Sequence, residues 1–279
     1  MIISIGKKLN TKAPIILVLD KKKKCEGCPA YLESYLSLFQ KSDEQLEYYK
    51  LKDQFIIFLK YQTTSEKMRI QGHKVRSLLQ QAVKTVQIAG NKEQALILAE
   101  GIALSNYQFL KYFKDASKRK YALKNISLIG ADKKEVTELN NVIKAVYWSR
   151  DMVNEPVSYL TATQLSKEIE KLGQEAKFDV KVLGKSQIKS LKMGGIMAVN
   201  KGSIEAPSFS IMEYKPKKPK NKKPVVLVGK GVVYDTGGLS LKPTAGSMDL
   251  MKSDMAGASC MAATIYAAAL NKLDVHIIG

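Results

Sequence analysis

One short, glycine-rich stretch of the sequence contains Lys230, Asp235, Lys242 and Asp254, with Asp249 between the last two. An apolar run over 225–228 precedes them, and small residues with helical character follow over 255–270. Charges at the end of a buried strand cost free energy unless they are paired or bind a metal. Strand ends are also where α/β sheets usually hold ligands. The stretch therefore predicts a metal and substrate site on a strand–loop–helix unit.

The residue types agree with that chemistry. Aspartate oxygens suit hard or borderline cations such as Mn²⁺, Mg²⁺ or Zn²⁺. A lysine can join them only as the neutral amine, which burial and a nearby cation both favour. A second lysine that keeps its proton would be a fixed positive charge against a developing oxyanion.

Each of these residues, taken singly, also has an ordinary structural interpretation. Asp254 could cap the following helix, and Asp235 fits the turn chemistry of Asp-Thr-Gly-Gly. Lys230 and Lys242 could be solvated surface lysines. The combination of all four on one unit favours the site.

The stretch resembles the signature of the leucyl aminopeptidases, the cytosolic two-metal exopeptidase family. It reads GKGVVYDTGGLSLKP over 229–243 and MDLMKSDMAGA over 248–258. Residues 149–156 and 193–203 resemble two further landmarks of the same family, and 99–109 carry a weaker likeness. The resemblance is dense from about residue 147 onward and loose before it.

The resemblance assigns a role to each of the four residues. Lys230 corresponds to an unusual lysine metal ligand, Asp235 to the carboxylate that bridges both metals, and Asp254 to a third ligand. Lys242 corresponds to the catalytic lysine that polarises the scissile carbonyl. Asp249 matches a position of the signature without a firm role.

The resemblance also implies a metal-dependent aminopeptidase that releases N-terminal amino acids from peptides, with a leucine-type preference. Its cofactors would be two divalent ions, Mn²⁺ or Zn²⁺, and a bicarbonate held by an arginine. The family usually forms homohexamers in the cytoplasm. The segment Asn-Thr-Asp-Ala-Glu-Gly-Arg, which supplies two more ligands and that arginine, is absent from this sequence.

That absence predicts an incomplete site. Asp235 and Asp254 offer only two negative charges, whereas a two-metal site must offset two dications. We therefore expect the 279 residues by themselves to bind metal weakly and to have little or no activity. Residues 274–279 read as a core strand with nothing after it, which favours a C-terminally truncated fragment.

The charge of the chain raises a different class of function. Forty-five basic and twenty-six acidic residues give a net charge of +19, which favours acidic partners such as nucleic acid. Six lysines and three prolines over 215–224 predict an exposed turn. Because the lysines are spread over both halves without interleaved aromatic residues, nucleic acid is the less favoured partner. The alternative function is a non-catalytic basic binding protein, or a degenerate family member.

No membrane partner is expected, because no apolar run reaches the roughly 20 residues of a membrane span. No leader follows Met1, so the default location is the cytoplasm. Cys25 and Cys28 form a CxxC in a loop that should be exposed, and they lack the further ligands of a zinc site. Cys260 is expected to be a small core residue.

The alternation of apolar runs predicts an α/β fold: a small N-terminal α/β domain over 1–150 without catalytic residues, then an incomplete α/β catalytic domain over 151–279 with a central mixed sheet. Strands are expected at 1–5, 15–19, 55–59, 85–88, 126–129, 178–182, 208–214 and 225–228. Helices are expected at 31–39, 65–84, 94–104, 134–151, 186–191 and 255–270. A further helix should begin at a capping box of Thr161 and Gln164 and stop at Gly173. Gly194-Gly195 should form a tight turn.

Overall fold

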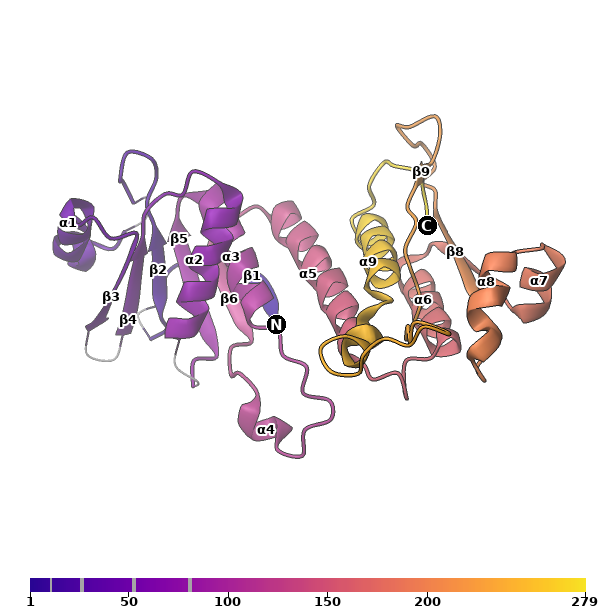
Figure 1. The fold of residues 1–279 in the computed structure, drawn as a ribbon. Coiled ribbons are helices and arrows are strands. Elements are labelled where there is room, and N and C mark those ends of the chain that lie inside the picture. Colours follow the sequence, from indigo (N-terminus) through magenta and orange to yellow (C-terminus); the bar gives the residue numbers. More distant parts are fainter. Residues whose placement is uncertain (11, 26–27, 52–53, 80–81) are drawn as a thin grey trace. The chain divides into compact units, whose positions relative to one another are not determined.

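The computed structural model describes residues 1–10, 12–25, 28–51, 54–79 and 82–279. They form two compact units, Met1–Ile143 and Lys144–Gly279, and the division falls inside one long helix, α5 (Lys133–Asn154). The architecture is mixed α/β throughout, which confirms the expected fold class (Figure 1). The expected domain assignment, 1–150 and 151–279, stays a prediction.

The N-terminal unit is built on a six-stranded sheet in the order β1-β6-β5-β2-β4-β3. Its strands are β1 (Ile2–Gly6), β2 (Ile15–Val18), β3 (Leu46–Leu51), β4 (Gln54–Leu59), β5 (Thr85–Gly90) and β6 (Asn125–Ile129). Its helices are η1 (Ala30–Leu32), α1 (Glu33–Lys41), α2 (Ser65–Leu78), α3 (Lys92–Ser105) and α4 (Ala116–Arg119). All neighbouring strands are parallel except β3 and β4. Every residue of β2 is buried, because a central parallel strand is covered on both faces.

The five strands predicted for this half are confirmed. Strand β3 was missed because its sequence, LEYYKL, mixes charged and aromatic residues, as suits an edge strand. The helix predicted over 65–84 is wrong in length, since α2 ends at Leu78, and residues 80–81 lie outside the described part of the chain.

The C-terminal unit has a four-stranded mixed sheet in the order β7-β8-β10-β9. Its strands are β7 (Asp179–Leu183), β8 (Phe209–Tyr214), β9 (Val225–Val226) and β10 (Ile277–Ile278). Its helices are α6 (Ala162–Ala176), α7 (Lys185–Ser190), α8 (Gly194–Val199), η2 (Asn200–Gly202), η3 (Met248–Ser253) and α9 (Ala256–Leu270). Strand β10 pairs antiparallel with β8 and parallel with β9, so the predicted mixed sheet and the predicted last strand are both confirmed.

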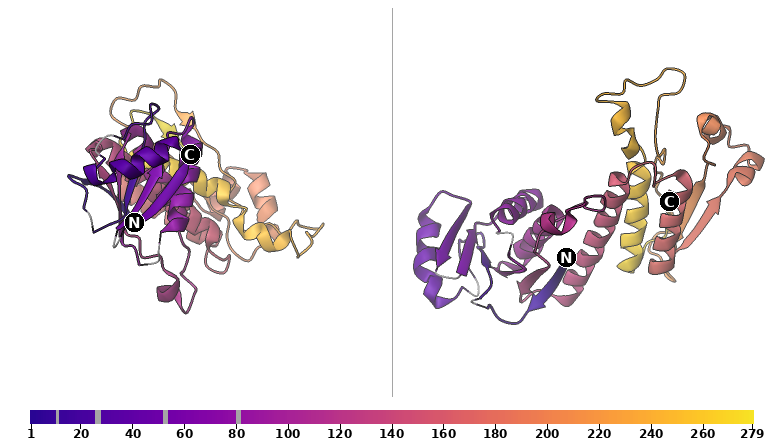
Figure 2. Two further views of the ribbon diagram at one scale, coloured as in Figure 1. Left: turned by 90° about the vertical axis from the view of Figure 1, so that its left-hand side faces the viewer. Right: turned by 90° about the horizontal axis from the view of Figure 1, so that it is seen from below.

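Helices α6 and α9 lie side by side in both Figure 1 and Figure 2, and they pack together in the core of this unit. Tyr266 and Ile265 of α9 are almost completely buried, as is Met255 at its start. The helix predicted over 255–270 is therefore confirmed. Cys260, in contrast, is exposed, so its predicted place in the core is wrong.

Two glycines act differently from expectation. Helix α6 continues past Gly173 to Ala176, and Lys177 ends it with a left-handed φ of 59°. Gly173 is required for packing instead, because a Cβ there would lie 2.5 Å from Val180 Cγ2. Gly194 does not form a tight turn but begins α8.

The start of α6 is only partly as predicted. The Thr161 hydroxyl accepts a hydrogen bond from the backbone N–H of Gln164 at 3.3 Å, which confirms the N-cap. The Gln164 side chain donates to Glu168 Oε1 at 2.7 Å, so it does not complete the capping box.

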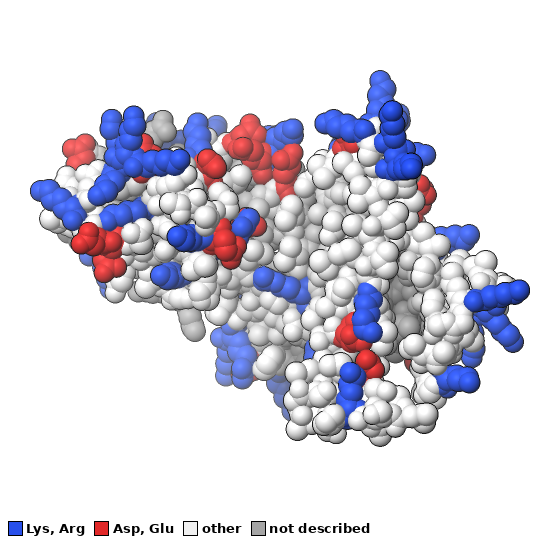
Figure 3. Space-filling model, turned by 45° about the horizontal axis from the view of Figure 1, so that its top comes forward, with Lys and Arg blue, Asp and Glu red and all other residues white. Residues whose placement is uncertain are grey.

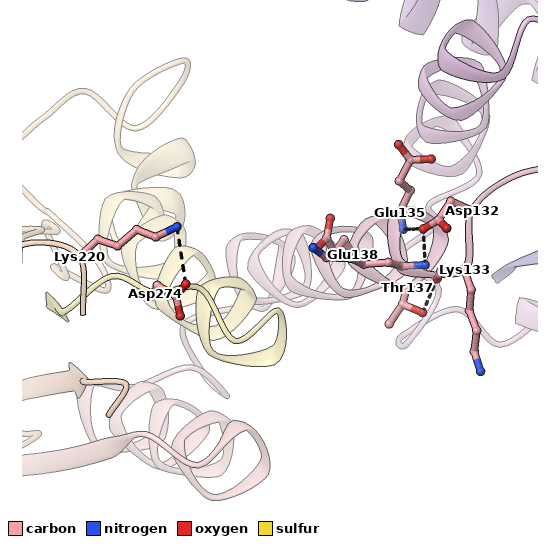
Figure 4. A network of polar contacts seen from close by, with 8 residues as sticks. Asp132, Lys133, Glu135, Thr137, Glu138, Lys220 and Asp274 are labelled. Atoms are coloured by element: carbon pink, nitrogen blue, oxygen red, sulfur yellow. Dashed lines mark hydrogen bonds and ion pairs between the residues drawn. The ribbon is translucent and has the colours of Figure 1, made fainter. Parts of the chain in front are cut away.

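Asp132 caps the long helix α5. Its Oδ1 accepts hydrogen bonds from the backbone N–H groups of Lys134 at 2.7 Å and Glu135 at 3.2 Å, as Figure 4 shows. The carboxylate also complements the positive end of the helix dipole. The cap accounts for the beginning of the helix at Lys133, close to the expected residue 134.

The lysine-rich loop over 215–224 is exposed, as predicted, and in Figure 3 lysine side chains gather at the upper right where this loop projects. Lys220 holds the loop to Asp274. The backbone N–H of Lys220 donates to the backbone carbonyl of Asp274 at 2.8 Å, and the Lys220 ammonium lies 3.6 Å from the Asp274 carboxylate (Figure 4). Nucleic acid as a partner of this loop stays a prediction.

Cys25 and Cys28 are half-buried rather than exposed, and both pack against the core cluster that contains Leu17 and Leu32. A hydrogen bond with Cys28 and burial both raise the pKa of the Cys25 thiol. The intervening residues 26–27 of the CxxC lie outside the described part of the chain.

Glu175 links three helices of the C-terminal unit. Its carboxylate accepts hydrogen bonds from Lys144 on α5 and from the hydroxyl of Tyr266 on α9, the latter at 2.8 Å. The hydrogen bond between Lys144 and Glu175 lowers the pKa of Glu175 and raises the pKa of Lys144.

This lowered pKa makes a prediction for acid stability. The stabilisation by Glu175 is present above the ordinary glutamate pKa of about 4.3 and is lost as the pH falls through the lowered value. Glu175→Gln should remove this acid sensitivity. The loss amounts to about 1 kcal/mol or less of the free energy of unfolding, because the pair is half-exposed. Urea unfolding at neutral pH and at about pH 3 measures the difference. Glu170→Gln on the same helix is the control, and an unchanged acid response in Glu175→Gln would contradict the prediction.

Candidate metal centre

The predicted strand over 225–228 is shorter and more exposed than expected. Strand β9 ends at Val226, and Val228 is 86% exposed. The reason is that β9 is the edge strand of its sheet in the described chain, so nothing described covers its outer side. The charges of the candidate site therefore follow an exposed edge strand rather than a buried one.

The backbone of Lys230 packs directly on the first turn of α9. Its carbonyl accepts a hydrogen bond from the N–H of Ala258 at 2.9 Å. Gly229 makes this approach possible, because a Cβ there would lie 2.6 Å from Ala258 Cα and 2.7 Å from Gly257 O. The loop that follows β9 is thus held against the start of the helix.

We expect Gly229→Ala to destabilise the C-terminal unit by about 1–3 kcal/mol, because backbone atoms rather than a flexible side chain must move. Urea unfolding measures the loss. Gly231→Ala is the matched control from the same loop, since its Cβ would lie at an ordinary 3.4 Å from Ala258 Cβ. Equal stability of the two variants would show that the loop does not need this close approach.

Lys230 and Asp254 form the first of two Lys–Asp pairs. Lys230 Nζ lies 3.3 Å from Asp254 Oδ2, with the Asp254 side chain only 20% exposed. Asp254 closes η3 and does not cap α9, whose N-cap is Met255 without a side-chain hydrogen bond. The helix-capping interpretation of Asp254 is therefore wrong.

Asp235 and Lys242 form the second pair. Asp235 Oδ2 lies 3.6 Å from Lys242 Nζ, and Asp235 Oδ1 accepts a hydrogen bond from the backbone N–H of Gly237 at 2.9 Å. That backbone hydrogen bond, followed by the charges of Lys242 and Lys230, lowers the pKa of Asp235. Asp235 is thus an ionised turn residue with one oxygen directed to Lys242.

Gly237 shapes this turn. Its φ is +94°, and Gly238 follows with a φ of +80°, both in the left-handed region that favours glycine. The backbone N–H of Lys242 donates to the Thr236 carbonyl at 3.0 Å and closes the loop. The turn interpretation of Asp235 is therefore confirmed, and it is compatible with a role for the second carboxylate oxygen.

Lys252 lies within the signature, but the sequence assigned no role to it. Its ammonium donates hydrogen bonds to the carbonyls of Val153 at 2.9 Å and Asn154 at 3.0 Å, at the C-terminal end of α5. A lysine there satisfies terminal carbonyls and complements the helix dipole. It brings the landmark over 149–156 beside the candidate site. Asp249 accepts the N–H of Gly246 at 3.4 Å and helps to close the loop.

One buried atom is compatible with a cation site. Asp254 Oδ2 has almost no solvent exposure and accepts no hydrogen bond from the described residues. The Lys230 ammonium, 3.3 Å away, compensates its charge in this structure. A divalent cation held by Asp235, Asp254 and Lys230 would take over that role.

The described residues are too few for a second ion. Within them, no three His, Cys, Asp or Glu side chains come close enough together to hold a metal by themselves. Two carboxylates also leave two dications with a net positive charge. The described donors for a cation are therefore Asp235, Asp254 and Lys230, and two ions would need further ligands.

Residues 147–279 match the model of the cytosol aminopeptidase family, catalytic domain. These residues belong to the cytosol aminopeptidase family. The resemblance stated from the signature is thereby confirmed. The lysines and aspartates of the two pairs all lie inside the matched residues.

Curated relatives described as probable cytosol aminopeptidases agree with this assignment. The one from Chlorobaculum parvum is 50% identical over 131 residues, which are 47% of this chain and 26% of the relative. The one from Clostridium tetani is 39% identical over 65% of this chain and 38% of its own length. The one from Brucella anthropi is 37% identical over 75% of this chain and 42% of its own length. The chain thus spans about a quarter to two fifths of the length of these relatives.

Solved structures show the same fold. A mutant of tomato leucine aminopeptidase matches with a TM-score of 0.79 and 19% identity, over 100% of this chain and 61% of its own. The bottromycin maturation enzyme BotP in complex with Mn matches with a TM-score of 0.76 and 24% identity, over 97% of this chain and 58% of its own.

Among the helices of the described residues, none has the length and apolar character of a membrane span.

Proposed function

We propose that this chain is part of a metal-dependent aminopeptidase that releases N-terminal amino acids from peptides. The observation that carries the proposal is the convergence of the two Lys–Asp pairs on one loop of the family-matched residues, with Asp254 Oδ2 buried and lacking a hydrogen bond. A buried carboxylate oxygen needs a positive partner, which Lys230 supplies in this structure and a divalent cation would supply in the enzyme.

Lys230, Asp235 and Asp254 would hold the divalent cation, which supplies Lewis-acid polarisation of a carbonyl when it is bound. Lys242 would donate hydrogen bonds to the oxygen of the scissile carbonyl as negative charge develops there. Its side chain is 30% exposed, so a substrate can reach it.

The finer parts of the proposal rest on the family. We propose a two-metal mechanism with Mn²⁺ or Zn²⁺ and a leucine-type preference, and the family also implies a bicarbonate, whose arginine is absent from this sequence. We also propose that the enzyme forms a homohexamer in the cytoplasm. The complex of the neighbour BotP with Mn supports the choice of metal.

Peptides with free and with acetylated N-termini distinguish an aminopeptidase from other hydrolases. The gene product that contains residues 1–279 is incubated with both kinds and with Mn²⁺ or Zn²⁺, and the products are identified by mass spectrometry. We expect loss of single N-terminal residues from the free peptides only. Internal cleavage, equal cleavage of acetylated peptides, or no cleavage with either metal would overturn the proposal. The 279 residues by themselves should turn over little substrate, because their ligand set is incomplete.

A further inference from the structure

The CxxC of the N-terminal unit brings two thiols close together, outside the family-matched residues. The backbone N–H of Cys28 donates to the carbonyl of Cys25 at 3.4 Å, so the backbones of the two residues are in contact. Both side chains also pack on the same core cluster, which contains Leu17 and Leu32. The backbone hydrogen bond and the shared cluster therefore hold the two sulfur atoms near each other.

The two thiols also interact with each other. A side-chain hydrogen bond between them lowers the pKa of Cys28 and, together with burial, raises the pKa of Cys25. Cys25 is thus the donor that keeps its proton, and Cys28 is the sulfur that carries the negative charge. A thiolate with a second thiol beside it is the arrangement that thiol–disulfide exchange needs, because the first sulfur attacks and the second completes the exchange.

A small molecule can reach the pair, since both cysteines are partly exposed. The four exposed lysines Lys21–Lys24 directly precede Cys25, and cations near a thiol attract anionic reagents. The carboxylate of Asp20 opposes their effect at Cys25. Within the residues that the structure describes, no group of three His, Cys, Asp or Glu side chains could hold a metal. The described surroundings therefore favour exchange chemistry over a zinc site, which needs four ligands.

We propose that Cys25 and Cys28 form a thiol–disulfide exchange site that is oxidised by small anionic disulfides such as glutathione disulfide. The Cys28 thiolate attacks one sulfur of the glutathione disulfide and forms a mixed disulfide, and one glutathione leaves as its thiolate. Cys25 then gives its proton to that thiolate and attacks the Cys28 sulfur, which releases the second glutathione. Two protein thiols are thereby oxidised to one disulfide, and one glutathione disulfide is reduced to two glutathione molecules.

Treatment of the full chain with millimolar glutathione disulfide, in EDTA, tests the proposal independently of the metal centre. The remaining thiols are then alkylated, and the tryptic peptides are identified by mass spectrometry. Cys25 and Cys28 lie together in the tryptic peptide 25–41. We expect this peptide to lose two hydrogen atoms and to carry no glutathione. Cys260, an exposed cysteine of α9, is the internal control and should carry one glutathione.

Two serine variants test the roles of the two sulfur atoms, because serine keeps a hydroxyl that can donate a hydrogen bond. In Cys25→Ser, Cys28 should stay as the mixed disulfide with glutathione. This mixed disulfide should form at least about 10-fold faster than the one on Cys25 in Cys28→Ser, because Cys28 is the thiolate. In urea, where the fold is lost, the two rates should agree within about twofold. Circular dichroism verifies that both variants are folded without urea.

Three results would contradict the proposal. Stable glutathione on Cys25 or Cys28 of the unchanged chain would show that the second sulfur does not complete the exchange. Oxidation of Cys260 alone would show that glutathione disulfide does not react with the pair. Equal rates in the two folded serine variants would show that Cys28 is not the attacking thiolate.

Discussion

Replacement of Asp235 by asparagine should abolish the binding of a divalent cation at the candidate centre. Asparagine keeps an oxygen for the backbone N–H of Gly237 and so preserves the turn, but it removes the charge that a cation needs. Changes of residues that merely support a ligand cost about 10–100-fold in metal affinity. The loss of a ligand itself should therefore exceed that range. Mn²⁺ titration followed by electron paramagnetic resonance measures the affinity.

Asp249→Asn is the matched control for this experiment. Asp249 is an exposed carboxylate in η3, and among the described residues it accepts a hydrogen bond only from the N–H of Gly246. We expect its replacement to leave Mn²⁺ affinity within about threefold of the wild type. Full Mn²⁺ occupancy in Asp235→Asn would show that the ligand assignment is wrong.

Replacement of Lys242 by alanine should lower kcat of the peptidase by about 10²–10³-fold, or about 2.7–4 kcal/mol of barrier, which is typical of losing one oxyanion donor. The metal content should stay unchanged, because Lys242 is proposed to face the substrate rather than the cation. Steady-state kinetics with a peptide substrate, together with metal analysis of the same preparations, separates the two effects.

The control for Lys242→Ala is Lys222→Ala, which removes one exposed lysine from the loop over 215–224. Its kcat should equal that of the wild type. If Lys242→Ala instead lost its metal, or kept its kcat, Lys242 would not be the group that stabilises the oxyanion. Because Lys242 is ion-paired with the proposed metal ligand Asp235, loss of metal in Lys242→Ala must be measured directly.

The sequence by itself determined those features that depend on neighbouring residues. The apolar runs predicted the strands of both sheets except β3, because a buried strand needs only about four to eight apolar residues in a row. Asp235 and Gly237 are two residues apart, so their turn was readable from residue types. The signature over 229–258 also placed the four charged residues on one strand–loop–helix unit, since they all lie within one short segment.

Only the tertiary structure decided which charges meet. It pairs Lys230 with Asp254 and Lys242 with Asp235, and it leaves Asp254 Oδ2 without a hydrogen bond. It also carries Lys252 to the end of α5, 98 residues earlier in the chain. Such contacts depend on loop closure and on the packing of distant elements, and neither produces a periodic pattern of residues in the sequence. The exposure of β9 has the same origin, because strand order in a sheet is a long-range property.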